Sequence, residues 1–367
     1  RQDPLSPKQQ KYLSMAESSV DTLAVLINDI LDLSKIESGK LEINLQRFSP
    51  RPLIETLIQT CALKAYDKGV NVVLDSSEID HSQLYSDPNR IKQILNNLIS
   101  NAIKFTQQGE IKIVAATQEL DSNTVRLSVE VIDSGIGISP QKFSKLFASF
   151  TQLDEGTARQ YGGTGLGLAI VKRLAIAMGG NVQFKSKQNQ GSRFYGSILI
   201  EKSDSGEIVA PNFDVSQLEV LIVDDNPVNL SILADQLSHW GIKVTQVNSG
   251  KQAIIMCEKR IAKGQDLFDI AILDMQMPNM DGIELGGQLK QDPRFSSMHL
   301  VMMTSMVMEN DNQVMANIGF SGHFSKPVNT SDLFLALSVI GDNGQALKHA
   351  YPLITHDYLN SLKITNS

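Results

Sequence analysis

The order of strand-like and helix-like segments changes near residue 218, and this change requires two different folds in one chain. Between residues 43 and 201, the strands come in pairs and the helices stand apart from them. That segregated order is typical of an α+β sandwich. Between residues 218 and 341, five short apolar segments alternate with helical ones. This alternation predicts an α/β doubly wound, five-stranded parallel sheet.

The length and composition of the chain leave room for both folds. Its 367 residues are 42% hydrophobic and 20% charged, and at about 150 residues per domain they make two or three domains. The formal net charge of -7 provides no global basic field that would attract nucleic acid. Cys61 and Cys257 lie far apart and fit no metal-ligand spacing, so we expect buried thiols in a reducing compartment.

Two polar stretches separate or follow these folds. Residues 202–217 contain Pro and Gly without periodicity and predict a linker, and residues 342–367 predict a tail or a second linker. No apolar run reaches the roughly 18 residues of a membrane helix, and no signal peptide opens the chain. Because the first residue is Arg1 rather than Met, we expect a fragment of a longer protein.

Residues 9–40 predict one long amphipathic helix, which Gly39 is placed to end. Its apolar residues recur at three- and four-residue spacing, at Leu13, Ala16, Val20, Leu23, Ile27, Ile30 and Leu33. With no partner helix before it, the segment 1–42 predicts one half of a helical hairpin or dimer bundle. The alternative is a helix packed on the following domain.

Residues 43–201 contain the elements of the sandwich. One expected helix begins with Asp87 as its N-cap and Pro88 in its first turn. The expected helices span 49–68, 87–106 and about 166–178, and the expected strands span 70–75, 111–117, 125–133, 181–187 and 192–200.

The sequence QYGGTGLGLAI at residues 160–170 places Gly163, Gly165 and Gly167 directly before a helix. Flexible backbone at a helix N-terminus often binds phosphate. The glycine spacing excludes a dinucleotide fingerprint, and the absence of a following Lys-Ser or Lys-Thr excludes a P-loop. Taken alone, a purely structural turn explains the motif equally well.

The sequence NNLISNAIKFT supplies polar groups suited to a nucleotide and its metal. Asn97 and Asn101 lie at i and i+4, so both amides face the same way, with Lys104 on nearly the same face. A neutral amide oxygen suits a Mg²⁺ ion that already carries ATP phosphates and waters. Lys104 adds a point charge for those phosphates.

The sequence DSGIGIS follows at residues 133–139. Asp133 ends a strand, where its carboxylate can accept a hydrogen bond from an exocyclic amine such as that of adenine. Gly135 and Gly137 let the backbone approach the base.

These motifs, together with LFASFTQLD at residues 146–154, resemble the four boxes of a histidine-kinase catalytic domain of the GHKL ATPase type, over about residues 44–200. The resemblance implies a Bergerat ATP site in which Asn101 is the main Mg²⁺ ligand, Asn97 supports it and Asp133 reads adenine. It implies that Phe147 and Phe150 pack the base of a mobile lid. The other implied ATP-binding residues are Lys104, Gly135, Gly137, Gly163, Thr164, Gly165, Leu166 and Gly167. Arg159, before Tyr161, reaches the γ-phosphate or is simply solvated.

The sequence LINDILDLSKIESGKLE at residues 26–42 resembles the second helix of the kinase dimerisation domain. In that family, the preceding helix carries the phospho-accepting histidine. The first histidine here is His81, in a polar stretch, and the rest are His239, His299, His323, His349 and His356. The histidine helix therefore lies upstream of Arg1, or is lacking and the protein is a kinase-like regulator. In either case we expect no histidine autophosphorylation by this chain alone.

In the second domain, acidic residues fall at strand ends. Asp224 and Asp225 end one strand and Asp274 ends another, so all three converge at the ligand edge of a doubly wound sheet. Gathered carboxylates need a cation, and Mg²⁺ suits hard oxygen ligands. Thr304 and Lys326 follow at two further strand ends. This set suits phosphorylation of Asp274, with Lys326 offsetting charge and Thr304 bonding the product oxygen.

The order of these residues resembles a response-regulator receiver domain, of flavodoxin-like fold, over residues 218–341. Pro327 follows the lysine, where the family has a cis peptide. Receivers usually carry an aromatic residue three positions before the lysine, but His323 stands there. An imidazole can charge near neutral pH, which puts the usual readout in doubt. Phe324 is expected on the opposite face of the strand.

Together, the resemblances imply the cytoplasmic part of a hybrid sensor histidine kinase of a two-component phosphorelay. ATP and Mg²⁺ would support histidine phosphorylation, followed by transfer to Asp274. The implied partners are a second copy through the helical hairpin and a downstream histidine-phosphotransfer domain or response regulator, with no nucleic acid and no direct membrane contact. The parent protein would be anchored in the inner or plasma membrane.

Two alternatives remain open. One is a GHKL ATPase that acts as a molecular clamp, against which the fused receiver argues. The other is a nucleotide-binding regulator that controls another kinase by forming heterodimers.

Overall fold

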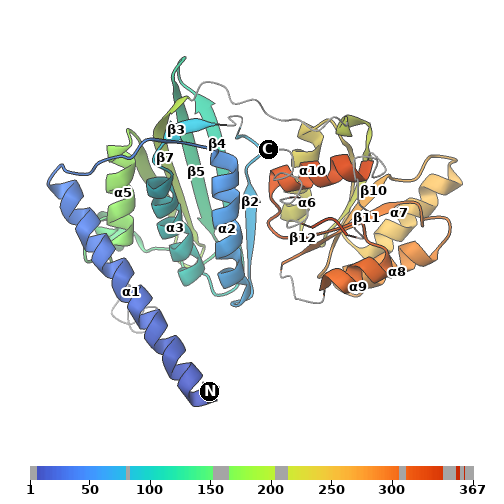
Figure 1. Ribbon diagram of the computed structural model, residues 1–367, viewed down its shortest axis with the longest axis horizontal. Helices are drawn as coiled ribbons and strands as arrows, with labels where there is room; N and C mark the ends of the chain where they lie inside the picture. Colours follow the sequence, from blue (N-terminus) through green and yellow to red (C-terminus); the bar gives the residue numbers. More distant parts are fainter. Residues whose placement is uncertain are drawn as a thin grey trace, which may run out of the picture.

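The computed structural model describes residues 6–79, 83–151, 165–202, 214–305, 311–341, 353–355 and 359. Figure 1 shows a long helix, then a sheet covered on one face by helices, then a second sheet with helices on both faces. The two sheet units lie side by side. No helix within the described ranges combines the length and the apolar character needed to cross a membrane.

Helix α1 spans Pro7–Glu37 and confirms the predicted long helix. Ser6 caps its N-terminus together with Gln9 in a reciprocal capping box. The helix joins the sheet unit near its C-terminal end, where Leu33 is buried and Asp32 forms a 2.8 Å ion pair with Arg90. The exposed large apolar side chains along the rest of α1 are Tyr12, Leu13, Met15, Val20, Leu23, Ile27, Ile30 and Leu31.

The first unit is an α+β sandwich, as expected. Helices α2 (Pro50–Tyr66), α3 (Pro88–Phe105) and α5 (Gly167–Ala177) form one layer against a seven-stranded sheet (Figure 1). The sheet has the order β1-β3-β7-β5-β4-β2, with β6 also paired to β7. Its strands are β1 Gln46–Phe48, β2 Val70–Asp75, β3 Leu84–Ser86, β4 Gly109–Glu119, β5 Thr124–Asp133, β6 Asn181–Ser186 and β7 Ser192–Lys202. The three-residue strands β1 and β3 were not predicted, because so short a segment carries almost no alternation.

Helix α3 begins where the sequence predicts. The Asp87 side chain accepts hydrogen bonds from the backbone N–H groups of Asn89 and Arg90, and Pro88 occupies the first turn. One face of α3, including Ile91, Leu95 and Leu98, is buried against the sheet. The residues of the predicted nucleotide site on this helix, Asn97, Asn101 and Lys104, are half-buried.

The second unit is an all-parallel five-stranded sheet of order β12-β11-β10-β8-β9, as expected for a doubly wound fold. Helices α6 and α10 cover one face and α7, α8 and α9 the other. The strands are β8 Glu219–Val223, β9 Lys243–Val247, β10 Ile270–Asp274, β11 His299–Thr304 and β12 Gly322–Ser325. The helices are α6 Pro227–His239, α7 Gly250–Ala262, α8 Gly282–Gln291, α9 Asp311–Ile318 and α10 Thr330–Gly341.

Two segments predicted as linker or tail contribute to this second core. Val215 forms part of a short 3-10 turn and is buried with α6 and α10. Beyond α10, Leu353, Ile354 and Leu359 are buried, and Ile354 forms a parallel bridge to Gly322 on β12. Isolated apolar residues in polar sequence gave no periodic signal of this packing.

A buried carboxyl lies where the two units meet. Glu55 on α2 is 1% exposed, and its Oε1 atom accepts a 3.1 Å hydrogen bond from Ser76. Burial raises the pKa of the Glu55 carboxyl, although hydrogen bonds from Thr330 and Ser76 and the charge of Arg51 oppose the rise. An ionised Glu55 therefore costs folding free energy above its raised pKa.

We expect Glu55→Gln to raise the thermal unfolding temperature of the chain at pH 8. The folded-state pKa lies above the unfolded one, so the cost that the substitution removes exists at high pH and vanishes as the pH falls through the raised pKa. Melting curves between pH 8 and pH 4.5 test this, with Glu42→Gln on an exposed loop as the control. An unchanged or lower unfolding temperature at pH 8 contradicts it.

Candidate functional site

The predicted nucleotide residues of α3 lie against the start of α5. A Cβ atom added to Gly167, the first residue of α5, would lie 2.9 Å from Asn97 Oδ1. Glycine therefore allows the positive N-terminal end of α5 to approach the amide of Asn97, an arrangement that suits an anion. Asn101 is half-buried one turn further along α3. Lys104 follows, and burial lowers the pKa of its ammonium group.

Asp133 is held in a fixed orientation at the end of β5. Its side chain is 8% exposed, and Oδ1 accepts hydrogen bonds from the backbone N–H groups of Gly135 at 2.9 Å and Ser192 at 3.3 Å. Burial raises the pKa of the carboxyl, while these hydrogen bonds oppose the rise. A buried carboxylate fixed by backbone donors suits recognition of a polar ligand edge.

Gly135 and Gly137 are required by the protein's own backbone. A Cβ atom at Gly135 would lie 2.4 Å from the Phe105 carbonyl oxygen, and one at Gly137 would lie 2.0 Å from that of Lys187. Gly137 also adopts a φ of +62°, which favours glycine. The sequence argument assigned both glycines to approach of the base, whereas these contacts give them a packing role.

The described residues include only the ends of the predicted lid. Arg159, Tyr161, Gly163 and Thr164 lie outside them. Gly165 has a φ of +70°, and a Cβ atom there would lie 2.8 Å from the carbonyl oxygen of Thr151, so the two ends of the segment meet. Leu166 is completely buried in the core.

The two phenylalanines of the predicted lid base differ. Phe147 packs against the core, with its ring centroid 5.8 Å from that of Phe184. Phe150 is 66% exposed and has a φ of +60°, so the expectation that it packs at the lid base is wrong in this structure. The spacing of aromatic residues in a short irregular segment does not determine which side chain turns inward.

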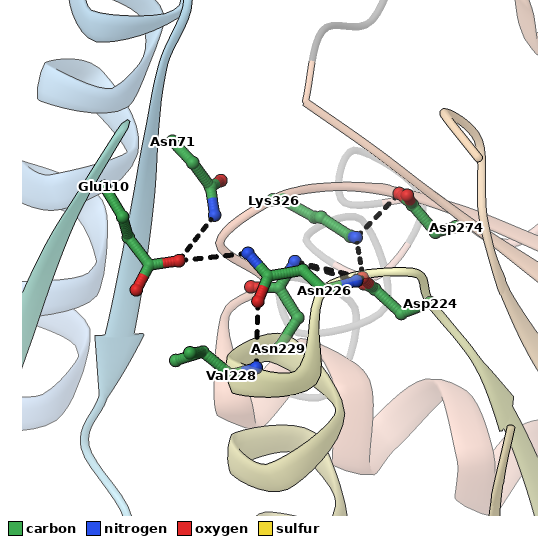
Figure 2. A network of polar contacts seen from close by, with 8 residues as sticks. All are labelled: Asn71, Glu110, Asp224, Asn226, Val228, Asn229, Asp274 and Lys326. Carbon is green, nitrogen blue, oxygen red and sulfur yellow. Dashed lines mark hydrogen bonds and ion pairs between the residues drawn. The ribbon is translucent and has the colours of Figure 1, made fainter. Parts of the chain in front are cut away.

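In the second unit, the predicted acids converge. One oxygen from each of Asp224, Asp225 and Asp274 lies within 4.8 Å of the others. Asp224 and Asp274 are buried and Asp225 is exposed. Lys326 Nζ donates to Asp224 Oδ2 at 2.5 Å and to Asp274 Oδ1 at 2.6 Å (Figure 2). Because three carboxylates repel one another at this range, the lysine partly offsets their charge.

Burial and charge act together on these groups. Burial raises the pKa of Asp274, Lys326 lowers it in part, and Asp224 and Asp225 add to the rise. Burial alone would lower the pKa of Lys326, but Asp274 and Asp224 raise it overall. The lysine therefore stays charged between the two buried carboxylates. Hard oxygen donors of this number and spacing fit a Mg²⁺ ion.

The remaining predicted residues lie on strands β11 and β12 or directly after them. Thr304 is the last residue of β11 and is 2% exposed. Its Oγ1 atom lies 3.3 Å from Met275 Sδ. The Lys326–Pro327 peptide is cis. His323 is buried, with Nδ1 2.8 Å from Asn312 Oδ1. Phe324 packs on the α6–α10 side of the sheet.

The sequence argument missed two asparagines beside Asp224. The backbone N–H of Asn226 donates to Asp224 Oδ1 at 2.8 Å, and the Asn229 amide lies 3.2 Å from Oδ2 (Figure 2). Asn226 also caps α6 before Pro227. The Asn-Pro pair is a helix-start signal, so the cap was detectable although the contact with Asp224 was not.

Comparisons with known proteins agree with this division. Residues 86–202 match the family of histidine kinase-, DNA gyrase B- and HSP90-like ATPases. Residues 220–338 match the response regulator receiver domain, and residues 1–39 match the His Kinase A (phospho-acceptor) domain.

Several relatives match most of the chain, including the following two. The aerobic respiration control sensor protein ArcB of Escherichia coli K12 is 34% identical over 90% of this chain and 42% of its own length. The autoinducer 2 sensor kinase/phosphatase LuxQ of Vibrio cholerae is 32% identical over 92% of this chain and 39% of its own length. The chain thus spans about two fifths of the length of these relatives.

A solved structure shares the arrangement of elements. The crystal structure of full-length ShkA in complex with AMPPNP has a TM-score of 0.66 and 24% identity, covering 95% of this chain and 67% of that chain. The fold resembles that of ShkA, the matched domains follow the predicted order, and the predicted acidic residues of the receiver lie together. The chain thus joins an ATP-binding domain of the histidine-kinase type to a response-regulator receiver domain in one polypeptide, which is the arrangement of the hybrid sensor histidine kinases.

Proposed function

We propose that this chain uses ATP to phosphorylate a histidine of a dimerisation domain and that Asp274 then accepts the phosphoryl group. The observation that carries the proposal is Lys326, held between buried Asp224 and Asp274, in the same chain as an ATP-binding domain of the histidine-kinase type. Residues 43–201 and 218–341 are the proposed limits of the two domains.

In the proposed ATP site, α3 and α5 provide the phosphate end. Asn101 and Asn97 offer neutral oxygens to a Mg²⁺ ion, which when bound would offset the charge of the triphosphate. The N-terminus of α5 and the Lys104 ammonium add positive potential. The Asp133 carboxylate, oriented by the Gly135 N–H, accepts a hydrogen bond from the adenine amine.

In the proposed receiver site, one bond breaks and one forms. A carboxylate oxygen of Asp274 attacks phosphorus, the nitrogen–phosphorus bond of phosphohistidine breaks, and the imidazole leaves with its electron pair. Lys326 offsets charge on the phosphoryl oxygens, and the Thr304 hydroxyl donates to one of them. Asp224 and Asp225 would hold the cation that such a transfer needs, and the cation would offset the charge of the phosphoryl oxygens.

The proposed partners follow from the same chemistry. The exposed apolar residues of α1 suit a helical hairpin shared with a second copy. Phosphoryl groups on Asp274 would pass to a histidine-phosphotransfer domain or response regulator. Both proposed sites belong in the cytoplasm, where ATP is available, with the parent protein anchored in a membrane.

A second candidate is a regulator that binds nucleotide and controls another kinase through heterodimers. The observation favouring it is that residues 1–39, which match a phospho-acceptor domain, contain no histidine. The two candidates differ in whether Asp274 receives phosphate from ATP.

We expect Asn101→Ala to weaken Mg²⁺-dependent ATP binding about tenfold, equivalent to roughly 1.4 kcal/mol, because a metal ligand is lost. Calorimetric titration of the chain with ATP in Mg²⁺ measures this. Asn96→Ala is the matched control, since Asn96 is an exposed asparagine on the same helix. Equal affinities in the two variants contradict the assignment of Asn101.

We expect Asp274→Asn to abolish base-labile label when the chain receives γ-labelled ATP and a separate histidine-bearing dimerisation domain. The amide is not a phosphoryl acceptor, so label would stop at acid-labile phosphohistidine. Asp266→Asn, on an exposed loop of the same unit, is the control and should transfer normally. Absence of all label despite Mg²⁺-dependent ATP binding would favour the regulator.

A further inference from the structure

Three of the loops that surround the acceptor site contact the ATP-binding unit. On the loop after β8, the Asn226 amide donates to Glu110 Oε2 of β4 at 3.0 Å. On the loop after β10, the Gln276 amide donates to the Tyr66 hydroxyl at the end of α2, at 3.1 Å. These two loops carry the acidic residues of the receiver site.

The third loop, after β12, carries Lys326 and makes the same kind of contact. The Gln59 amide of α2 donates to the Pro327 carbonyl oxygen at 3.0 Å, one residue beyond the lysine. Further along, Thr330 and Ser76 are both buried, with their hydroxyl oxygens 3.5 Å apart. Three loops around the receiver site therefore contact the catalytic unit.

The contact at Glu110 is linked to the acids themselves. Asn71 of β2 donates to the same Glu110 oxygen at 3.1 Å, which fixes the carboxylate toward Asn226 (Figure 2). Asn226 in turn donates its backbone N–H to Asp224. A residue of the ATP-binding unit thus lies two hydrogen bonds away from a proposed metal ligand.

This arrangement treats small and large phosphodonors differently. Asp225 is exposed, so a cation or a small molecule can reach the acidic cluster from solvent. A phosphohistidine on a folded domain must bring its phosphorus to within about 3–3.5 Å of Asp274, which is only 8% exposed. Such a domain needs the rim that Gln59, Tyr66 and Glu110 occupy.

We propose that Gln59, Tyr66 and Glu110 form a docking surface that holds the receiver closed toward protein phosphodonors while leaving it open to small ones. The inference rests on the proposed transfer to Asp274. The contacts are mainly polar, each hydrogen bond contributes little net free energy, and polar interfaces between domains commonly open. Transfer from phosphohistidine then requires the receiver to leave this surface.

The first test compares two donors on the full chain, acetyl phosphate and a separately purified dimerisation domain phosphorylated on histidine. In the double variant Gln59→Ala, Glu110→Ala, the rate of Asp274 phosphorylation by the protein donor should rise about tenfold, as expected for loss of two hydrogen bonds. The acetyl phosphate rate should change less than about twofold. Thr60→Ala, whose exposed hydroxyl bonds within α2, is the control and should match the unmodified chain.

Equal protein-donor rates in the double variant and the unmodified chain would overturn the docking surface, as would equal acceleration with both donors. A second readout does not depend on phosphotransfer. Spin labels at Gln118→Cys and Lys259→Cys, both exposed, should give one narrow distance distribution that broadens in the double variant. A broad distribution in the unmodified chain overturns docking, whereas failure of both donors to label Asp274 overturns the proposed function.

Discussion

The repulsion among three carboxylates at the edge of the receiver sheet determines how that domain is built. Oxygens of Asp224, Asp225 and Asp274 lie within 4.8 Å of one another, and two of the three residues are buried. Such a cluster persists only if positive charge is held beside it. Lys326, on the loop after β12, supplies that charge. Its contacts with Asp224 and Asp274 join the ends of β8, β10 and β12 into one site.

The ATP-binding unit handles charge in the opposite way. Asn97 and Asn101 provide oxygen without negative charge, and Gly167 lets the end of α5 approach them. A site for a triphosphate needs positive potential that its own residues do not offset, whereas the three carboxylates around Asp274 are only partly offset by Lys326 and need a further cation before a phosphoryl group is accepted. One chain therefore holds two proposed phosphate sites of opposite local charge, and the phosphoryl group is proposed to pass from the first toward the second.

The sequence predicted those parts of the fold that depend on local patterns. The Asp87 cap, the α3 face and the acidic strand ends each follow from spacing within one or two turns or strands. Spacing could not predict that Val215 and Leu359 are buried or that Phe150 is exposed. The burial of such a single side chain depends on whether a segment distant in sequence packs over it. Gly135 and Gly137 are a third case. The sequence correctly indicated that glycine is needed there, but the backbone that would clash with a side chain belongs to Phe105 and Lys187, which are distant in sequence.

The contact between the two units was beyond sequence reasoning for a related reason. Gln59, Tyr66 and Glu110 are ordinary polar residues on a helix and a strand, and nothing in their spacing distinguishes them from solvated surface. Their significance comes from their place in the fold: β2, the edge strand of its sheet, contacts helix α6 of the receiver, and α2 and β4 lie directly beside β2. A few hydrogen bonds at such an edge suffice to orient the receiver, yet their small net free energy leaves it able to depart. The strongly charged interactions lie within the receiver and the weak ones between the units, so the proposed acceptor site would keep its geometry after the proposed release of the receiver.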